Sequence, residues 1–321
     1  MGVHMGGSIG NERVLAIEGI DPSLGQSENC SAARPSAQTW LLAIRPRTLP
    51  AVVAPVLLGT LCAIVDGRFR AVPALGALAF GLGVQITTNL SNDLLDFLKG
   101  ADTPQRLGPM RVTQSGLVTA AQMRAAVGVS FGITALLGGA LVWMGGIGFL
   151  SVVLVSLLLA LLYTGGPFPL AYIGLGDVFC FVFFGPVAVA ATYFLQSHRM
   201  TLSPLLAGAG LGALSTAILV INNLRDYEGD AAAKKKTLVV RFGRRFGRAE
   251  YLSLLAIAAV LPFFDGRAGS ILASASLLFG IPLAWTVHSS EDAEELNYAL
   301  GQTALLTGLY ACCYGVGLLL S

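Results

Sequence analysis

Long apolar stretches separated by short polar ones run through most of the chain. Charged residues, Pro or Gly bound each stretch, and the pattern predicts helices at 49–65, 72–90, 123–143, 147–163, 172–194, 202–221, 249–264, 270–287 and 296–320. A helix needs about 20 apolar residues to cross the hydrocarbon core of a bilayer, and most of these stretches approach that length. The sequence therefore predicts an all-α polytopic membrane protein with nine transmembrane helices.

Composition indicates the same class of protein. Charged residues make up 12% of the 321 residues, against about 25% in soluble domains, and apolar residues make up 55%. Most of the surface must therefore face a lipid bilayer. The net charge of +2 favours no nucleic-acid partner. The five cysteines form no Cys-x-x-Cys pair, which argues against a zinc or thioredoxin-like site.

The chain divides into two unequal parts. Residues 1–38 mix Gly, Ser, Glu and Arg and contain no apolar run long enough for the core of a signal peptide, so we expect a flexible N-terminal tail. Residues 39–321 carry all nine apolar stretches. We expect this second part to form a single transmembrane domain.

Lysine and arginine are distributed unequally between the two sets of loops that nine spans create. Sixteen of the twenty lie in the N-terminal tail or in the polar segments after the second and sixth apolar stretches. The other set of loops carries only Arg68, Arg70, Arg199 and Arg267. By the positive-inside rule, the N-terminus and both long polar segments face the cytoplasm. We expect the protein in the cytoplasmic (inner) membrane.

The first polar island follows the second apolar stretch. It contains Asn92, Asp93 and Asp96, which share one face of a continuing helix through their i, i+3 and i, i+4 spacings. Asp102 follows Gly100, where a bend would bring its carboxylate back toward the others.

The second polar island follows the sixth apolar stretch. Asn222, Asp226 and Asp230 are spaced i, i+4, i+8 and form a stripe along one helix face. Both islands lie at equivalent helix ends on the same predicted side of the membrane, four spans apart. This spacing indicates an internal repeat.

Five aspartates gathered on one membrane face would repel one another unless a multivalent cation lay between them. Magnesium prefers oxygen ligands and is usually held by one or two carboxylates plus substrate phosphates. Two such clusters can each hold one ion and clamp a diphosphate between them, where the ions stabilise a departing diphosphate. A pair of solvated acidic loops is the alternative, but a second cluster at an equivalent helix end favours a functional site.

Five ordered motifs narrow this interpretation. They are 45–50 (RPRTLP), 92–102 (NDLLDFLKGAD), 163–169 (YTGGPFP), 222–226 (NNLRD) and 236–243 (KTLVVRFG). The two aspartate-rich motifs resemble those of the UbiA-type intramembrane aromatic prenyltransferases. The whole set resembles the 1,4-dihydroxy-2-naphthoate polyprenyltransferase branch of that family, over a region from about Trp40 to the C-terminus. The chain departs from this branch at Lys234 and Lys235, where Gly-Lys is usual.

The resemblance implies a fold and a reaction. The fold is nine helices around a central cavity, with cytoplasmic loops capping a site for Mg²⁺ and diphosphate. The reaction is Mg²⁺-dependent transfer of a polyprenyl group from polyprenyl diphosphate to 1,4-dihydroxy-2-naphthoate, with loss of CO₂ and diphosphate. Its product is demethylmenaquinone, so the implied pathway is menaquinone biosynthesis.

Each candidate residue receives a role as a hypothesis. We expect one magnesium ion at Asn92, Asp93, Asp96 and Asp102 and the other at Asp226 and Asp230, with the aspartates of the two motifs essential for catalysis. The candidates for binding diphosphate or the acceptor are Arg45, Lys99, Arg106, Asn222, Arg225 and Lys235. For each of the cations, a role in setting membrane topology is the alternative.

Two further assignments concern the substrates. Arg45 enters the first span on the cytoplasmic side, where it would meet the naphthoate carboxylate or a diphosphate oxygen. The ring of Tyr163, at the end of the fourth span, would stabilise a developing allylic cation through its face. An aromatic-belt tyrosine is the alternative for Tyr163.

Two other functions remain open at this stage. A prenyltransferase of the same family acting on 4-hydroxybenzoate or homogentisate would share the site but not the acceptor. A secondary transporter would also combine intramembrane polar residues with a repeat of spans. Transporter sites lie near the bilayer midplane, however, whereas both aspartate clusters here lie at helix ends.

Overall fold

A computed structural model describes residues 35–100, 110–167 and 169–321, and all regular structure in these ranges is helical. The elements of the N-terminal half are α2 (Ala37–Ile44), η2 (Pro46–Thr48), α3 (Pro50–Val65), α4 (Ala71–Leu98), α5 (Ala120–Gly145), η3 (Ile147–Phe149), α6 (Leu150–Leu162), α7 (Gly176–Phe183) and α8 (Pro186–Ser197). Those of the C-terminal half are α9 (Leu202–Arg225), α10 (Tyr227–Ala232), α11 (Leu238–Phe242), α12 (Arg244–Val260), η4 (Leu261–Phe264), η5 (Ala268–Ser270), α13 (Ile271–Ser276), η6 (Leu277–Phe279), α14 (Gly280–Ser289) and α15 (Ala293–Leu320).

Several of these helices are long and apolar enough to cross a membrane. Within the described ranges they number seven, or eight if the pair formed by Ala37–Thr48 and Pro50–Val65, bent by 50°, counts as one span. Ile147–Leu162 is apolar but shorter than these. Gly146, at φ +82°, separates it from α5. The chain is an integral membrane protein with an all-helical fold.

The predicted fifth helix, 172–194, differs from the observed structure. The chain remains irregular through Leu175, and the span is two helices, α7 and α8, with a break at Gly185. Pro186 begins α8 and cannot continue the hydrogen bonding of α7. The break also permits close packing on α9, because a Cβ added to Gly185 would lie 2.6 Å from the carbonyl oxygen of Gly208. The Gly-x-Gly-x-Gly run at 208–212 therefore serves helix packing.

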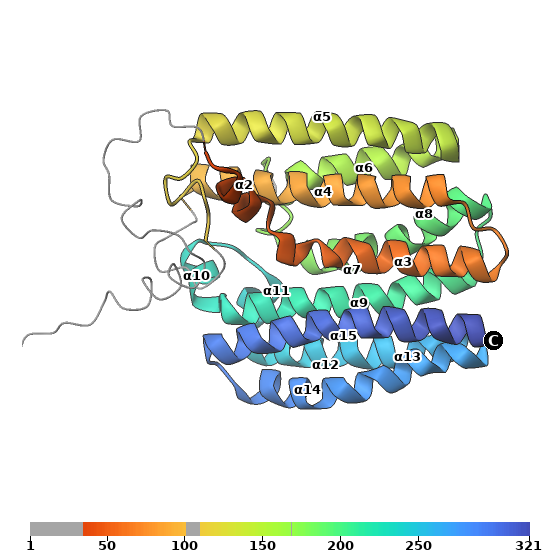
Figure 1. Cartoon of the computed structure of the whole chain (residues 1–321). Coiled ribbons are helices and arrows are strands. Elements are labelled where there is room, and N and C mark those ends of the chain that lie inside the picture. Colours follow the sequence, from red (N-terminus) through yellow and green to blue (C-terminus); the bar gives the residue numbers. More distant parts are fainter. Residues whose placement is uncertain (1–34, 101–109, 168) are drawn as a thin grey trace, which may run out of the picture.

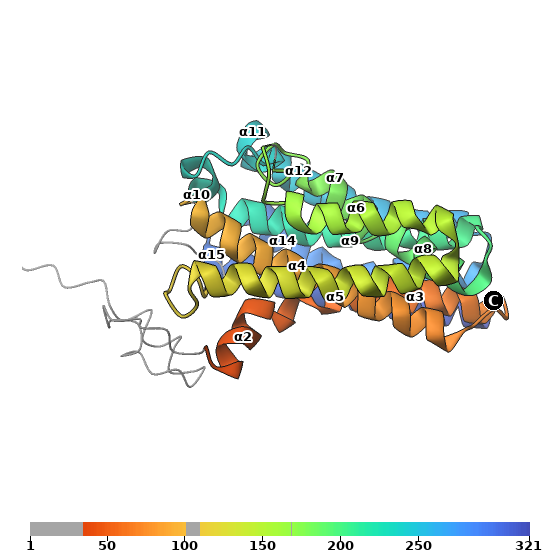
Figure 2. The same cartoon turned by 90° about the horizontal axis from the view of Figure 1, so that it is seen from above.

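The bundle is built around α9. Its contacts are with α12, α15, α8, α7 and α3, and it is buried over most of its length. Figures 1 and 2 show it running through the bundle, and in Figure 1 α3 and α8 lie above it and α12 and α15 below it. The largest buried apolar cluster surrounds it and includes Leu211, Leu214 and Ile221. By contrast, α5 lies at the edge and exposes most of its surface.

The loops divide between the two ends of the bundle as the distribution of Lys and Arg predicts. At one end, the amide N–H of Lys236 donates to the carbonyl of Tyr172, and Arg248 pairs with Glu291. At the other end, where the C-terminus lies, Arg267 pairs with Asp66. Loops far apart in sequence are thus joined within each end.

The Asp66–Arg267 contact predicts a pH-dependent contribution to stability. Burial raises the pKa of Asp66, but hydrogen bonds from Tyr193 (2.6 Å) and Arg267 (2.8 Å) outweigh it and hold the pKa below 3.8. A depressed carboxyl pKa stabilises the fold at neutral pH, and the stabilisation is lost as pH falls through that pKa. Arg267→Ala should therefore lower the free energy of unfolding by about 1 kcal/mol near pH 7, and by less near pH 3.

Melting temperatures of detergent-purified protein across this pH range would measure the effect. Arg245→Ala, which removes an exposed guanidinium at the other end of the bundle, is the control and should not change the melting temperature. A loss of stability for Arg267→Ala that is the same at both pH values would contradict the assignment.

Candidate active site

The first predicted cluster lies on the last two turns of α4, which continues through Leu98 as expected. Asp93 is 1% exposed, and its two carboxylate oxygens accept hydrogen bonds from the amide N–H groups of Val112 (3.1 Å) and Thr113 (3.0 Å). Charged acceptors bind backbone N–H groups strongly. Asp93 therefore ties the segment after α4 to the helix end.

Asp96 is the centre of the first cluster. Arg111 donates to one carboxylate oxygen at 2.7 Å, and the hydroxyl of Tyr172 donates to the other at 3.0 Å. Both charged side chains are buried, so this ion pair acts in a low dielectric and is strongly coupled. In the sequence, Arg111 is one of the cations that set the predicted topology. No local pattern links residues 96 and 111, because 15 positions separate them.

Asn92 and Lys99 both contact Thr164, in the loop after α6. The Thr164 hydroxyl donates to the Asn92 amide oxygen at 2.5 Å, and the Lys99 ammonium donates to the Thr164 carbonyl. Burial lowers the pKa of Lys99 most; Asp96 opposes the shift and Lys235 adds to it, leaving the pKa below its ordinary value. The lysine head is therefore held at the site and close to a second cation.

The second cluster forms around Arg225 at the end of α9. Its guanidinium donates to both carboxylate oxygens of Asp226 (2.8 and 2.6 Å), to Asn222 (2.7 Å) and to Asn297 of α15 (2.7 Å). The Arg225 side chain is only 3% exposed. These contacts orient the Asp226 carboxylate. They also occupy guanidinium N–H groups that were predicted from the sequence to bind diphosphate oxygens.

Asp230 lies on the short helix α10, one element beyond Asp226. Its carboxylate pairs with Lys235 at 3.4 Å, and its carbonyl accepts from the Lys235 amide at 2.8 Å. The predicted stripe of residues 222, 226 and 230 is kept across the end of α9, because the Asp226 amide donates to the Asn222 carbonyl (3.0 Å) and the Asp230 amide donates to the Asp226 carbonyl (2.8 Å).

Tyr172 connects the two clusters. Its ring lies 4.6 Å from the Lys99 ammonium and 5.3 Å from that of Lys235, while its hydroxyl donates to Asp96. Ammonium groups at these distances are attracted to the negative face of an aromatic ring. The hydrophobic pattern places Tyr172 at the start of a predicted span, so it was not among the predicted site residues. The signal available was its position in the loop that follows the Tyr-Thr-Gly-Gly-Pro motif.

Two other predicted residues lie beside the clusters. Tyr163 is partly buried against the start of α7, where a Cβ added to Gly176 would lie 3.3 Å from its hydroxyl. Arg45 joins α2 to η2 in a left-handed conformation (φ +57°). Asn89, one turn before Asn92, donates to the carbonyl of Ile44 at 2.7 Å. The segment carrying Arg45 is thereby held against α4 near the first cluster.

The remaining predictions concern Asp102, Arg106 and the metal. Asp102 and Arg106 lie outside the described residues. Among those that are described, no three His, Cys, Asp or Glu side chains form a metal-binding group by themselves. The donor set nevertheless fits Mg²⁺, because the clusters offer carboxylate and amide oxygens, and Mg²⁺ typically takes only one or two carboxylates and completes its coordination with water and phosphate.

Comparison with known proteins identifies the family. The model of the UbiA prenyltransferase family matches residues 52–314. The chain belongs to the UbiA prenyltransferase family. The 1,4-dihydroxy-2-naphthoate octaprenyltransferase of Escherichia coli is 40% identical over 224 residues, covering 68% of this chain and 73% of that protein. The enzyme of the same name from Haemophilus influenzae is 32% identical over 300 residues, covering 88% and 96%.

UbiA-family structures have the same fold. The structure of a UbiA homologue from Archaeoglobus fulgidus bound to GPP and Mg²⁺ superposes with a TM-score of 0.65, at 16% identity, over 88% of this chain and all of that one. Because UbiA-family chains retain this arrangement at such low identity, the helix packing does not depend on most individual side chains.

The position of Tyr172 predicts a measurable effect on catalysis. Tyr172→Phe removes the hydroxyl bonded to Asp96 and should lower kcat/KM for the prenyl diphosphate about tenfold, since a hydrogen bond to a charged group contributes about 1.5–3 kcal/mol. Tyr172→Leu also removes the ring between Lys99 and Lys235 and should lower it further. Steady-state rates of purified protein would measure both.

Tyr298→Phe, at an exposed position on α15, is the matched control. Wild-type kcat/KM in both Tyr172 variants would show that the residue does not link the clusters functionally.

Proposed function

We propose that this chain transfers a polyprenyl group from polyprenyl diphosphate to 1,4-dihydroxy-2-naphthoate. The ring carbon that carries the carboxylate bonds to the allylic carbon, CO₂ and diphosphate leave, and the product is demethylmenaquinol, the hydroquinone form of demethylmenaquinone. The curated relatives with this activity in their names support the acceptor. The observation that carries the proposal is the pair of buried carboxylate clusters joined through Tyr172, with Lys99 and Lys235 beside its ring.

The proposal includes two magnesium ions. Asn92, Asp93 and Asp96, together with Asp102, would hold one of them, and Asp226 and Asp230 the other. Bound there, magnesium would supply Lewis-acid stabilisation of negative charge on the departing diphosphate. The carboxylates are engaged by protein donors without the substrate, which keeps buried charges paired.

The protein's own residues account for the rest of the reaction. Lys99 and Lys235 would bind diphosphate oxygens, because two ammonium groups held close together attract a dianion. Arg106 would join them. Arg45 would contact the acceptor carboxylate or a diphosphate oxygen. The face of Tyr163 would stabilise positive charge on the allylic carbon, and the apolar bundle would keep water from it.

Arg225 has a different role from the one that the sequence suggests. Its guanidinium is held by Asp226, Asn222 and Asn297, so it acts as a positioning residue for Asp226. Asn222 shares this network and would act with it on the substrate side.

The proposed topology has nine crossings: the seven long spans, the bent N-terminal pair and Ile147–Leu162. The N-terminus and both clusters would face the cytoplasm, in the cytoplasmic (inner) membrane. Residues 39–321 would form one transmembrane domain around a central cavity, preceded by a flexible tail.

Prenyl transfer by detergent-purified full-length protein tests the function directly. The substrates are 1,4-dihydroxy-2-naphthoate and a long-chain prenyl diphosphate, supplied with Mg²⁺ and then with excess EDTA. The expected result is a prenylated naphthoquinol that disappears with the chelator and returns when Mg²⁺ is restored. Exclusive prenylation of 4-hydroxybenzoate or homogentisate would show that the acceptor is one of these compounds and not the naphthoate. If folded protein transferred the prenyl group to no aromatic acceptor, the proposal would be refuted and a function as a secondary transporter would be favoured.

A further inference from the structure

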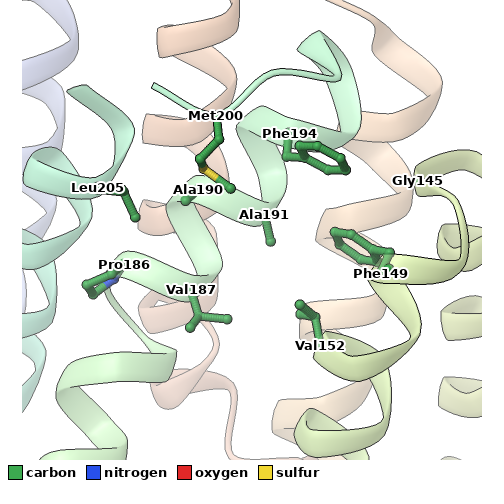
Figure 3. Close-up of a pocket in the computed structure, with 11 residues that line it drawn as sticks. Gly145, Phe149, Val152, Pro186, Val187, Ala190, Ala191, Phe194, Met200 and Leu205 are labelled. Atoms are coloured by element: carbon green, nitrogen blue, oxygen red, sulfur yellow. The ribbon is translucent and has the colours of Figure 1, made fainter. Parts of the chain in front are cut away.

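An apolar groove lies at the end of the bundle opposite the carboxylate clusters. It encloses about 410 Å³ between the start of α6 and α8, and Figure 3 shows its walls. Phe149 of η3 and Val152 of α6 face Ala190 and Ala191 of α8 across it. Small side chains on α8 opposite large ones on α6 leave the space open.

The groove continues into a polar rim through aromatic contacts. Phe149 and Phe194 stack with ring centroids 6.5 Å apart and 8° between their planes. The His198 and Phe194 rings lie edge to face with their centroids 6.0 Å apart, and the Arg70 guanidinium contacts the His198 imidazole at 2.8 Å. One wall of the groove therefore leads from apolar rings directly to two exposed cationic or ionisable groups.

The rim carries positive charge that no carboxylate in the same loops offsets, whereas Arg267 at the same end is paired with Asp66. Arg70 directs its guanidinium to an imidazole, whereas Asp66, the acidic residue in the same loop, is engaged by Arg267 and Tyr193. Arg199 follows His198 and precedes Met200, which lines the groove. Three of the four arginines that the sequence leaves at this end, Arg68, Arg70 and Arg199, lie in the two loops around the rim.

We propose that this groove and rim bind one anionic phospholipid of the adjacent leaflet. An acyl chain occupies the groove between Phe149 and Ala190, and the phosphate contacts Arg70, His198 and Arg199. Guanidinium groups bind phosphate oxygens through paired, charge-assisted hydrogen bonds, and basic residues beside an apolar surface are typical of anionic lipid recognition. A soluble anion would not fill the groove, and a zwitterionic lipid would bind the rim less tightly because its cationic headgroup is repelled by the arginines.

The inference does not depend on the proposed reaction. It concerns the end of the molecule opposite the clusters, and its test measures lipid binding without substrate. The probes are dioleoyl phosphatidylglycerol and dioleoyl phosphatidylcholine, which share acyl chains and differ in net charge. Each is added to delipidated, detergent-purified full-length protein, and retained lipid is measured by native mass spectrometry.

We expect the wild-type protein to retain one phosphatidylglycerol with at least about tenfold preference over phosphatidylcholine. Ala190→Trp fills the groove and should abolish retention of that lipid. The double variant Arg70→Gln with His198→Gln leaves the groove intact and should remove the preference for the charged lipid. Because the rim variants change only exposed side chains, they test the proposal even if the Trp variant does not fold.

Matched controls are Leu136→Trp, on the lipid-facing surface of α5, and Arg245→Gln, an exposed arginine near the carboxylate clusters. Neither should change retention. Equal retention of the two lipids by the wild type, or undiminished preference in the rim variant, would overturn the proposal. A dimer that disappears in Ala190→Trp would instead assign the groove to a second copy of the chain.

Discussion

Asp226→Asn should lower the rate of prenyl transfer by at least about a thousandfold while leaving the protein folded. The substitution keeps the size of the side chain and an oxygen that can accept from Arg225, but removes the negative charge that a divalent cation requires. Loss of metal-based stabilisation of a departing diphosphate costs several kcal/mol, and each 1.4 kcal/mol is a factor of ten in rate. Asp96→Asn should have a similar effect, because Asp96 is the corresponding carboxylate of the first cluster.

Product formation at increasing Mg²⁺ concentrations is the measurement. Glu228→Gln is the matched control. It removes a carboxylate two residues from Asp226, and the Glu228 side chain is 81% exposed. The control should keep the wild-type rate and melting temperature. Asp226→Asn and Asp96→Asn each leave a buried guanidinium without its carboxylate, so their melting temperatures should fall, and rates are compared at a temperature where every variant is folded. If Asp226→Asn and Asp96→Asn retained wild-type turnover at every Mg²⁺ concentration, the metal assignment would be wrong.

Substitution of Arg225 should affect both catalysis and stability, in proportions that depend on the replacement. Arg225→Met leaves the Asp226 carboxylate without its buried partner, and breaking a buried pair in this way typically costs about 3–5 kcal/mol of stability. Arg225→Lys keeps the charge but cannot form two parallel hydrogen bonds to Asp226. We expect Lys to recover most of the stability, while kcat remains about a hundredfold below wild type, as for other residues that orient metal ligands.

Melting temperatures and steady-state constants at varied Mg²⁺ would separate the two effects. A positioning role predicts that Arg225→Lys needs more Mg²⁺ for half-maximal activity. Arg245→Gln, at an exposed position on α12, should resemble the wild type in every respect. If Arg225→Lys recovered activity as fully as stability, Arg225 would have only a structural role.

The sequence alone determined the class of the protein and most of its helices, because both follow from local composition. Apolar stretches of about 20 residues have few alternatives to crossing a bilayer, where every backbone polar group must bond within its own segment. The same local logic located Asp93, Asp96, Asp226 and Asp230 at helix ends, and the distribution of Lys and Arg separated the two ends of the bundle.

Only the tertiary structure decided how these residues are connected. Tyr172 contacts Asp96 across 76 positions in sequence, Thr164 contacts Asn92 across 72, and Asn297 contacts Arg225 across 72. Each link passes through an irregular loop or between helices that meet only in the folded bundle, so no periodicity in the chain encodes it.

The apolar groove shows the same division. From the sequence, Phe149, Ala190 and Phe194 are unremarkable members of apolar stretches, and Arg70 and Arg199 are minor exceptions to the positive-inside rule. α6 and α8 flank a space there, and the His198 ring joins it to Arg70. Hydrophobicity along the chain determines which segments enter the membrane, because it acts through each segment separately. Which side chains meet depends on how helices pack against one another, and that is a property of the whole fold.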